Sequence, residues 1–275
     1  MAASATETSS GTVTRVLQLL TLIAQGEGEF GVKDVAQGLD LAPSTAHRLL
    51  NLLLADGFVA RSNLRRYRIG PEFLRMARMA LDGNDIVAAA LEPMRAIVDA
   101  CGETCLLAVY HPHRHTMSFV ARVDSANPLR YRVRMHGVET LAWGATGRSI
   151  LAFLPDPDIQ QVIARAEISP GSGRKLSVTE LKTDLAAIRA RGYAVSRSQR
   201  ITGAVGLSVP VYGEAGRMIG SLSVTVPEQR FRARDEARLG AALITASTDL
   251  SRALGVSGLE RPADSARRAS HVAQE

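Results

Sequence analysis

The first 70 residues constrain the fold most, because three helical patterns are followed there by an arginine-rich hairpin pattern. Apolar residues recur at helical spacing from Thr12 to Gln25, and shorter helices fit Lys33 to Gly38 and Pro43 to Ala55. Two short apolar runs, Phe58–Ala60 and Tyr67–Ile69, then flank a polar segment. Three helices and a small β-hairpin in this order are the outline of a winged helix-turn-helix domain.

Most of the positive charge lies just after these helices. The chain has 33 Lys and Arg against 27 Asp and Glu, a net charge of +6. Positions 58–80 contain six arginines and one acid and so carry +5, whereas positions 1–57 balance to −3 and positions 81–275 to +4. A basic stretch beside a helix-turn-helix predicts a polyanionic partner, and we expect double-stranded operator DNA.

The helix predicted from Pro43 to Ala55 has one apolar and one polar side. The residues expected to be buried are Ala46, Leu49, Leu50 and Leu53. Arginine and asparagine on the other side are suited to reading guanine and adenine in the major groove. A merely solvated helix face is the alternative, but the preceding short helix and the basic hairpin favour DNA binding. The residues predicted to contact DNA are Ser44, Thr45, His47, Arg48 and Asn51 of this helix, and Arg61, Arg65 and Arg66 of the hairpin.

The rest of the chain alternates helical and strand-like patterns. Pro71 begins a helix that Asp82–Gly83 ends and that would connect two domains. Further helices are expected at 86–100, from Thr146 to Phe153, at 178–191 and at 234–254. The six expected strands are 104–110, 116–123, 129–135, 193–198, 205–212 and 217–226, and in 129–135 Tyr131, Val133 and Met135 alternate with Arg130, Arg132 and Arg134. Hairpin-linked strands among helices predict an α+β domain with a mostly antiparallel six-stranded sheet flanked by helices.

The resulting domain organisation has five parts. We expect a disordered tail at 1–10, the DNA-binding domain at 11–70, a linker helix at 71–83, a second domain at 84–255 and a flexible tail at 256–275.

Other classes of protein are disfavoured by what the sequence lacks. Two cysteines are too few for a disulfide scaffold in a chain of 275 residues. No apolar run approaches the roughly 18 residues of a membrane helix. The first ten residues have neither the basic nor the apolar segment of a signal peptide. We therefore expect a soluble, cytoplasmic protein with no membrane partner.

Metal and catalytic chemistry are also not expected. The thiols and imidazoles of Cys101, Cys105, His111, His113 and His115 lie close together in the sequence, but their spacing matches no tetrahedral zinc motif. The segment at 144–149 resembles a phosphate loop but lacks its spacing and its lysine, and no nucleophile elbow or zinc-protease motif occurs. We expect no catalytic residue, no cofactor and no metal.

Several motifs together resemble one known family. The N-terminal part contains VLQLL, then KDVAQGLDLAPSTAHRLL, then GFV and YRIG. Beyond it come GET at 102–104, WGATGRSILAF at 143–153, ELKTDLAAIRARGYAVS at 180–196, GLSVPV and SLSVTVP. Over about residues 12–254 the chain resembles the IclR family of bacterial transcriptional regulators.

The resemblance implies a GAF-like second domain that binds a small-molecule effector, an organic acid or related metabolite. It also implies binding to a palindromic operator as a homodimer or a dimer of dimers. The small residues at 144–147, leading into a helix, offer backbone N–H groups to a carboxylate. By this resemblance the effector pocket would be lined by Met135, Gly137, Trp143, Ala145, Thr146, Gly147, Ser196, Gly206, Ser221 and Ser223.

Two departures from the family pattern concern this pocket. Members commonly have acidic residues after the segment that matches Gly192–Ser196, whereas here Arg197–Arg200 follows. Some members have a polar or thiol side chain where Gly206 stands, so a larger ligand, such as an aromatic acid or a lactone, would fit. The alternative function is a metabolite-binding module or enzyme whose helix-turn-helix serves only protein interaction.

Overall fold

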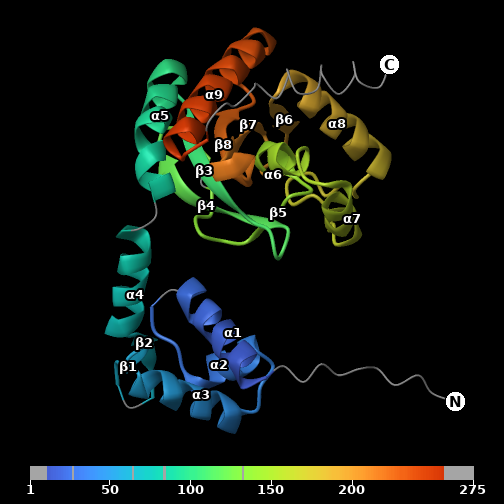
Figure 1. The fold of residues 1–275 in the computed structure, drawn as a ribbon. Helices are drawn as coiled ribbons and strands as arrows, with labels where there is room; N and C mark the ends of the chain where they lie inside the picture. Colours follow the sequence, from blue (N-terminus) through green and yellow to red (C-terminus); the bar gives the residue numbers. More distant parts are fainter. Residues whose placement is uncertain (1–10, 27, 64, 83–84, 132, 257–275) are drawn as a thin grey trace, which may run out of the picture. The chain divides into compact units, whose positions relative to one another are not determined.

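The computed structural model describes residues 11–26, 28–63, 65–82, 85–131 and 133–256 (Figure 1). It divides the chain into two compact units, the second of which begins at position 85. The tail expected at 1–10, Arg132, and all but the first residue of the tail expected at 256–275 lie outside the described residues.

The N-terminal unit is a winged helix-turn-helix, as predicted. Its elements are α1 (Thr12–Gln25), α2 (Val32–Gly38), α3 (Pro43–Ala55), β1 (Val59–Arg61), β2 (Tyr67–Ile69) and α4 (Pro71–Asp82). Strands β1 and β2 form an antiparallel hairpin in which Val59 pairs with Ile69. The core of the unit includes Leu19, Leu50 and Tyr67, so α1, α3 and the hairpin share it.

Two local features position α3 and the hairpin. Proline at the first position of α3 suits a helix start, because the first N–H groups of a helix have no intrahelical partner. Phe30 and Tyr67 exchange two backbone hydrogen bonds, of 2.9 and 2.8 Å, which tie the chain before α2 to β2. Gly70 ends the hairpin where a Cβ would lie only 2.1 Å from the Gly57 carbonyl oxygen, so no other residue fits there without a shift.

The C-terminal unit is built on one antiparallel sheet of six strands in the order β5-β4-β3-β8-β7-β6. The strands are β3 (Thr104–His111), β4 (Thr116–Val123), β5 (Glu139–Thr140), β6 (Ala194–Arg197), β7 (Ala204–Tyr212) and β8 (Met218–Pro227). The helices are α5 (Asp85–Cys101), α6 (Gly144–Leu151), α7 (Asp156–Ala164), α8 (Val178–Arg191) and α9 (Ala233–Ala253), with the short 3-10 helix η1 (Glu214–Gly216) before β8. Helices flanking a wholly antiparallel sheet confirm the α+β prediction.

Helices cover both faces of this sheet (Figure 1). In β3, alternate residues point to opposite faces. Leu107 belongs to the core that α5 and α9 cover, whereas Leu106 belongs to the core that α6, α7 and α8 cover. The two cores therefore lie on opposite faces of the sheet.

The prediction of a strand at 129–135 is wrong, because the described residues of this segment form no strand. The sixth strand of the sheet is β5 instead, which pairs with β4. The predicted alternation nevertheless reflects burial. Val133 and Met135 pack against the core beside α6, while Arg130 and Arg134 are exposed. Alternating burial needs only a chain that lies extended on a core, and it does not by itself require a hydrogen-bonded neighbour.

Two helices also differ from the prediction. Helix α7 was not expected, although Ile159 and Val162, three residues apart, form its buried side. Helix α6 begins at Gly144 rather than near Thr146. The small-residue segment is thus the first turn of the helix and not a turn before it.

Candidate DNA interface and effector cavity

Helix α3 presents the predicted polar side to solvent. The four apolar residues predicted to be buried are buried in the core of the unit, and Ser44, His47, Arg48 and Asn51 are exposed. Thr45 is half-buried at the edge of this face. The His47 Nδ1 and Asn51 Nδ2 atoms lie 3.3 Å apart, and Arg48 has no side-chain hydrogen bond or ion pair among the described residues. The face therefore offers a free guanidinium beside two groups that hydrogen-bond one another.

The three hairpin arginines have different surroundings. The Arg61 guanidinium carbon lies 5.7 Å from the centre of the Tyr67 ring. Arg65 is exposed, and within the described part of the chain its guanidinium has no partner. Arg66 instead donates from Nη2 to the Glu29 carbonyl oxygen at 2.6 Å and lies 3.7 Å from the Asp34 carboxylate. Arg61 and Arg65 are therefore freer to reach DNA, while Arg66 holds the hairpin to its own unit.

The Asn63 side chain holds the turn of the hairpin. Its Oδ1 accepts hydrogen bonds from the backbone N–H groups of Arg65 and Arg66, both at 3.0 Å. Side-chain acceptance of this kind is typical of asparagine in turns. Arg68 follows on β2, exposed and with no ion-pair partner in the described chain. Arg68 is not among the residues predicted to contact DNA, although its alternation with the buried Tyr67 is a sequence signal for exposure.

In the C-terminal unit, four of the ten predicted effector residues surround one cavity of about 40 Å³. These are Ala145 and Thr146 at the start of α6, Ser196 on β6 and Gly206 on β7. Ser196 and Gly206 are paired across the two strands. The remaining walls come from Leu106, Phe119, Val133, Gly144, Gln199, Arg200, Ile201, Ala204 and Thr225.

The first N–H groups of α6 already have partners. Gly144 N donates to Gln199 Oε1 at 3.0 Å, and Ala145 N donates to Ser196 Oγ at 2.8 Å. The prediction that the segment 144–147 offers free N–H groups to a carboxylate is therefore wrong for Gly144 and Ala145. The side chains of Gln199 and Ser196 therefore occupy the position at the start of α6 where an anion would bind.

Arg200 is the functional candidate that sequence reasoning missed. Its side chain is 15% exposed and pairs through Nη1 with the Glu139 carboxylate. Its Nη2 donates to the carbonyl oxygens of Thr140, at 2.9 Å, and Trp143, at 3.3 Å. Its Nε is buried and has no hydrogen-bond partner among the described atoms. A buried donor without an acceptor costs free energy, about 1–3 kcal/mol, so an acceptor in the cavity would relieve that cost.

Gly144 keeps this region open. Its φ is +81°, a conformation that favours glycine. A Cβ at this position would lie 3.3 Å from Arg200 Nε. The departure from the family pattern at Arg197–Arg200 was visible in the sequence, but the sequence did not show that one of these cations enters the cavity wall.

The other predicted effector residues lie outside the cavity walls. Trp143 is buried, and its Nε1 donates to the Glu167 carbonyl oxygen at 2.8 Å. Ser221 Oγ and Ser223 Oγ donate to the carbonyl oxygens of Thr146 and Leu106, at 3.3 and 3.4 Å. Through these hydrogen bonds, the side chains of Trp143, Ser221 and Ser223 hold backbone carbonyl groups near the cavity.

The remaining three predicted effector residues, Gly147, Met135 and Gly137, have other neighbours. Gly147 is in contact with Leu141, whose Cα would lie 2.7 Å from an added Cβ. Met135 packs on the core beside α6, and Gly137 is buried next to the Arg134 side chain. A direct contact with an effector stays a prediction for all three.

The cavity is small for the larger ligand expected from Gly206. Ligand pockets commonly measure roughly 300–1,000 Å³, several times more than this cavity. A Cβ at position 206 would lie 3.3 Å from Ser196 Oγ and 3.4 Å from Ala145 Cβ, so the missing side chain leaves little extra room. The expectation that Gly206 makes space for an aromatic acid or lactone stays a prediction, and it would require the cavity to enlarge.

The cluster of thiols and imidazoles is held by other contacts. His111 Nε2 lies 2.9 Å from Ser118 Oγ, and His115 Nδ1 lies 3.0 Å from the Tyr110 hydroxyl. Cys105 is buried, and burial raises the pKa of its thiol. Among the described residues, no three His, Cys, Asp or Glu side chains are placed to hold one metal ion. Across the same residues, no helix has the length and apolar character needed to span a membrane.

Comparisons with known proteins agree with both units. Residues 12–62 match the family model of the IclR helix-turn-helix domain. Residues 78–252 match that of the IclR C-terminal domain of bacterial transcriptional regulators. The glycerol operon regulatory protein of Streptomyces griseus is 30% identical over 223 residues, which cover 78% of this chain and 84% of that protein. The transcriptional repressor IclR of Escherichia coli K12 is 26% identical over 258 residues, covering 92% and 94%.

Solved structures share the fold. A crystal structure of an IclR-type regulator from Silicibacter sp. TM1040 superposes with a TM-score of 0.81 at 24% identity, covering 91% of this chain and 99% of that one. An IclR homologue from Microbacterium hydrocarbonoxydans, solved with 4-hydroxybenzoate, superposes with a TM-score of 0.75 at 21% identity, covering 89% and 99%.

Proposed function

Because the chain belongs to the IclR family of bacterial transcriptional regulators and carries its DNA-binding domain, we propose that it binds an operator through α3 and the hairpin. The observation that carries this proposal is the exposed polar side of α3, with the unpaired Arg48 at its centre. The N-terminal half of α3 would enter the major groove, where arginine and asparagine read base edges. Arg61 and Arg65 would contact the phosphate backbone or the minor groove.

The cavity in the C-terminal unit supports an effector with a carboxylate. Arg200 Nε is a buried donor without an acceptor in the described chain. Ser196 Oγ accepts from the Ala145 N–H, and its own hydroxyl proton can be donated to a ligand oxygen. The Microbacterium homologue was solved with 4-hydroxybenzoate, an aromatic carboxylate. We propose an organic acid whose carboxylate lies between Arg200 and Ser196.

Binding of such an acid requires the cavity to enlarge. One wall is the loop after β6, where Gln199 accepts from Gly144 N and Arg200 pairs with Glu139. A ligand carboxylate that replaces Glu139 on the guanidinium would free this loop and strand β5 together. Effector binding is thereby coupled to the edge of the sheet.

The effector would change operator affinity by favouring one arrangement of the DNA-binding domains, with α4 as the connecting helix. Such coupling is limited by the difference in effector affinity between the two states, commonly about 1–3 kcal/mol. We further propose that the protein acts in the cytoplasm, without catalysis, and binds a palindromic operator as a homodimer or a dimer of dimers.

A gel-shift titration with the intergenic DNA upstream of its own gene tests DNA binding. We expect the double variant Arg48→Ala, Arg65→Ala to lose affinity and to have a smaller salt dependence, by roughly 0.9 in slope per lost phosphate contact. Unchanged affinity and slope would refute the assigned DNA interface and favour a helix-turn-helix used for protein interaction.

A thermal-shift panel tests effector binding separately. It would compare 4-hydroxybenzoate and other carboxylates with their uncharged amides at equal concentration. We expect the carboxylates alone to raise the unfolding temperature. Equal shifts from acids and amides would contradict recognition by Arg200.

A further inference from the structure

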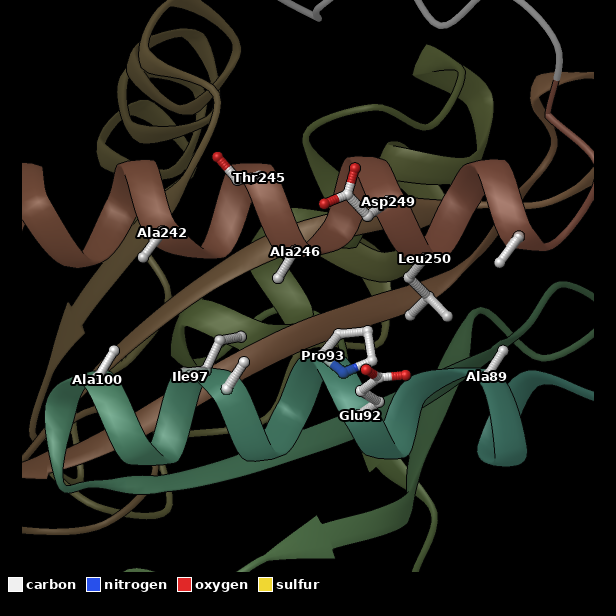
Figure 2. A pocket seen from close by; sticks show the side chains of 12 residues that line it. Ala89, Glu92, Pro93, Ile97, Ala100, Ala242, Thr245, Ala246, Asp249 and Leu250 are labelled. Carbon is white, nitrogen blue, oxygen red and sulfur yellow. The ribbon is translucent and has the colours of Figure 1, made fainter.

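Two cavities of the C-terminal unit, neither of them the effector cavity, differ in charge. The groove between α5 and α9 has a volume of about 640 Å³, and its charged lining residues are both acidic, Glu92 and Asp249 (Figure 2). A smaller cavity of about 120 Å³ lies at the start of α8, and we call it the α8 cavity. Four of its ten lining residues are arginine or lysine and one is acidic. Positive charge around a small cavity favours an anionic ligand.

Arg148 of α6 brings a buried guanidinium to the α8 cavity. The residue is only 8% exposed. Its Nη1 donates to the Asp184 carboxylate at 2.8 Å, and its Nε donates to the Ala142 carbonyl oxygen at 3.1 Å. Its Nη2 makes no hydrogen bond within the described part of the chain. Because two other bonds fix the guanidinium, Nη2 is a positioned donor for an oxyanion in the cavity.

Gln199 supplies a second donor to this cavity. Its Oε1 accepts from the Gly144 N–H at 3.0 Å, which assigns the Nε2 amide group to the other side of the side chain. That amide group has no hydrogen-bond partner among the described residues. Gln199 also lines the effector cavity, so this one side chain is a wall of both.

Lys175 and the start of α8 add positive charge. The Lys175 side chain is exposed and has no ion-pair partner in the part of the chain that the structure describes. Ser177 is the N-cap residue of α8 and lines the cavity, and its Oγ accepts from the Glu180 N–H at 3.3 Å. The start of a helix is positive and attracts anions.

The other charged residues around the cavity have partners. Glu180, the acidic lining residue, lies 3.2 Å from the Arg174 guanidinium. The Arg197 guanidinium carbon lies 4.8 Å from the centre of the Phe231 ring, so this cation is held elsewhere. The Lys175 ammonium is therefore the charge that an anion in the cavity would neutralise.

The size and the walls of the cavity suit a compact oxyanion. The segment before α8 is held in place by two backbone hydrogen bonds, from Ser169 N to the Arg174 carbonyl oxygen at 2.8 Å and from Gly171 N to the Gln199 carbonyl oxygen at 3.0 Å. A volume of 120 Å³ corresponds to about four water molecules, at roughly 30 Å³ each in the liquid. This is enough for a group with four oxygen atoms and too little for an aromatic acid.

We propose that the α8 cavity binds a phosphate group, either as inorganic phosphate or as the phosphoryl group of a small metabolite. The three donors, Arg148 Nη2, Lys175 Nζ and Gln199 Nε2, come from three separate segments of the chain. A tetrahedral oxyanion offers oxygen atoms in several directions, whereas the two oxygen atoms of a carboxylate lie in one plane. The site is additional to the proposed effector cavity.

Trp143 provides the measurement. It is the only tryptophan of the chain and lines the α8 cavity, where its ring centre lies 5.5 Å from the Arg148 guanidinium carbon. The full chain would be titrated with inorganic phosphate and with glycerol 3-phosphate, with KCl keeping the ionic strength constant. We expect a saturable change in fluorescence, a raised unfolding temperature, and binding of acetate at least tenfold weaker. Tighter binding of glycerol 3-phosphate would identify a metabolite, and tighter binding of inorganic phosphate the free ion.

Two lysine variants provide a matched comparison. Lys175→Gln should weaken phosphate binding by roughly threefold to tenfold, because it removes a charged donor. Lys182→Gln removes an exposed lysine of α8 that does not line the cavity and should leave binding unchanged. Arg148→Gln should abolish binding, with circular dichroism confirming that the variant is folded; the lysine pair tests the site even if it is not.

Three results would overturn the proposal. The first is the lack of any response to phosphate, beyond that to KCl, in both fluorescence and unfolding temperature. The second is an equal loss of binding in Lys175→Gln and Lys182→Gln, and the third is acetate binding as tight as that of phosphate. Because the titration uses neither DNA nor an organic acid effector, its outcome is independent of the tests of the proposed function.

Discussion

Arg200 and Glu139 form an ion pair that joins the wall of the cavity beside α6 to the edge strand of the sheet. The two residues are 61 positions apart in the chain. Glu139 lies in β5, which has only two residues and pairs with β4 at Thr116 and Met117. A ligand that competes for Arg200 therefore acts directly on the least extensively paired strand of the sheet.

Replacing Arg200 tests its role as the carboxylate receptor. Arg200→Gln should weaken binding of a carboxylate effector by roughly tenfold to a hundredfold, because a charged hydrogen bond contributes about 1.5–3 kcal/mol. Isothermal titration calorimetry measures this change. Glu139→Gln is the informative counterpart, since it removes the competing carboxylate and should strengthen binding. Weaker binding in both variants would show that the pair only supports the fold.

Two glycines predicted to bind effector should behave differently. Gly147→Ala places a methyl group 2.7 Å from the Leu141 backbone, so we expect a loss of roughly 1–3 kcal/mol of stability in urea unfolding. Gly206→Ala meets only side-chain atoms at 3.3–3.4 Å, so we expect nearly unchanged stability but weaker effector binding, because the methyl group enters the cavity. If both variants lost only effector binding, the packing role of Gly147 would be wrong.

The two neighbouring hairpin arginines offer a matched comparison. Arg65→Ala should reduce operator affinity and its salt dependence, because the guanidinium is unpaired within the described residues. Arg66→Ala should instead lower the stability of the N-terminal unit, by a few tenths to about 1 kcal/mol, since it removes exposed contacts with Glu29 and Asp34. Gel shifts at several salt concentrations and thermal unfolding separate the two effects. A larger salt effect in Arg66→Ala than in Arg65→Ala would reverse this assignment.

His111 gives the C-terminal unit a pH-dependent contribution to stability. Burial first, and then the nearby Arg114 charge, hold the pKa of His111 below its usual value. The unfolded chain therefore takes up the proton at a higher pH than the folded one. Stability should fall as the pH drops from about 6.5 through the lowered pKa, and level off below it. Urea unfolding at several pH values should show this slope, and His111→Gln should reduce it. An identical slope in that variant would assign the effect to another group.

Much of the architecture follows from local patterns. The buried side of α3 was predictable from its apolar residues, Ala46, Leu49, Leu50 and Leu53, which recur at the period of a helix. Residues with this spacing lie on one side of a helix, and an apolar side faces the core. Five of the six strands were predictable because each is a short, mainly apolar run of strand length. The exception, 129–135, has the right alternation and the right buried residues but no paired strand.

The sequence by itself determined the two-domain organisation, the helix-turn-helix with its basic hairpin, and the α+β character of the second unit. Only the tertiary structure placed Arg200 in the cavity wall, used Ser196 and Gln199 to cap α6, and opened a groove between α5 and α9. The physical reason is that periodicity and charge along a chain encode which side of an element is buried or solvated. The atoms that meet that side come from segments distant in sequence, so their identity depends on how the elements pack.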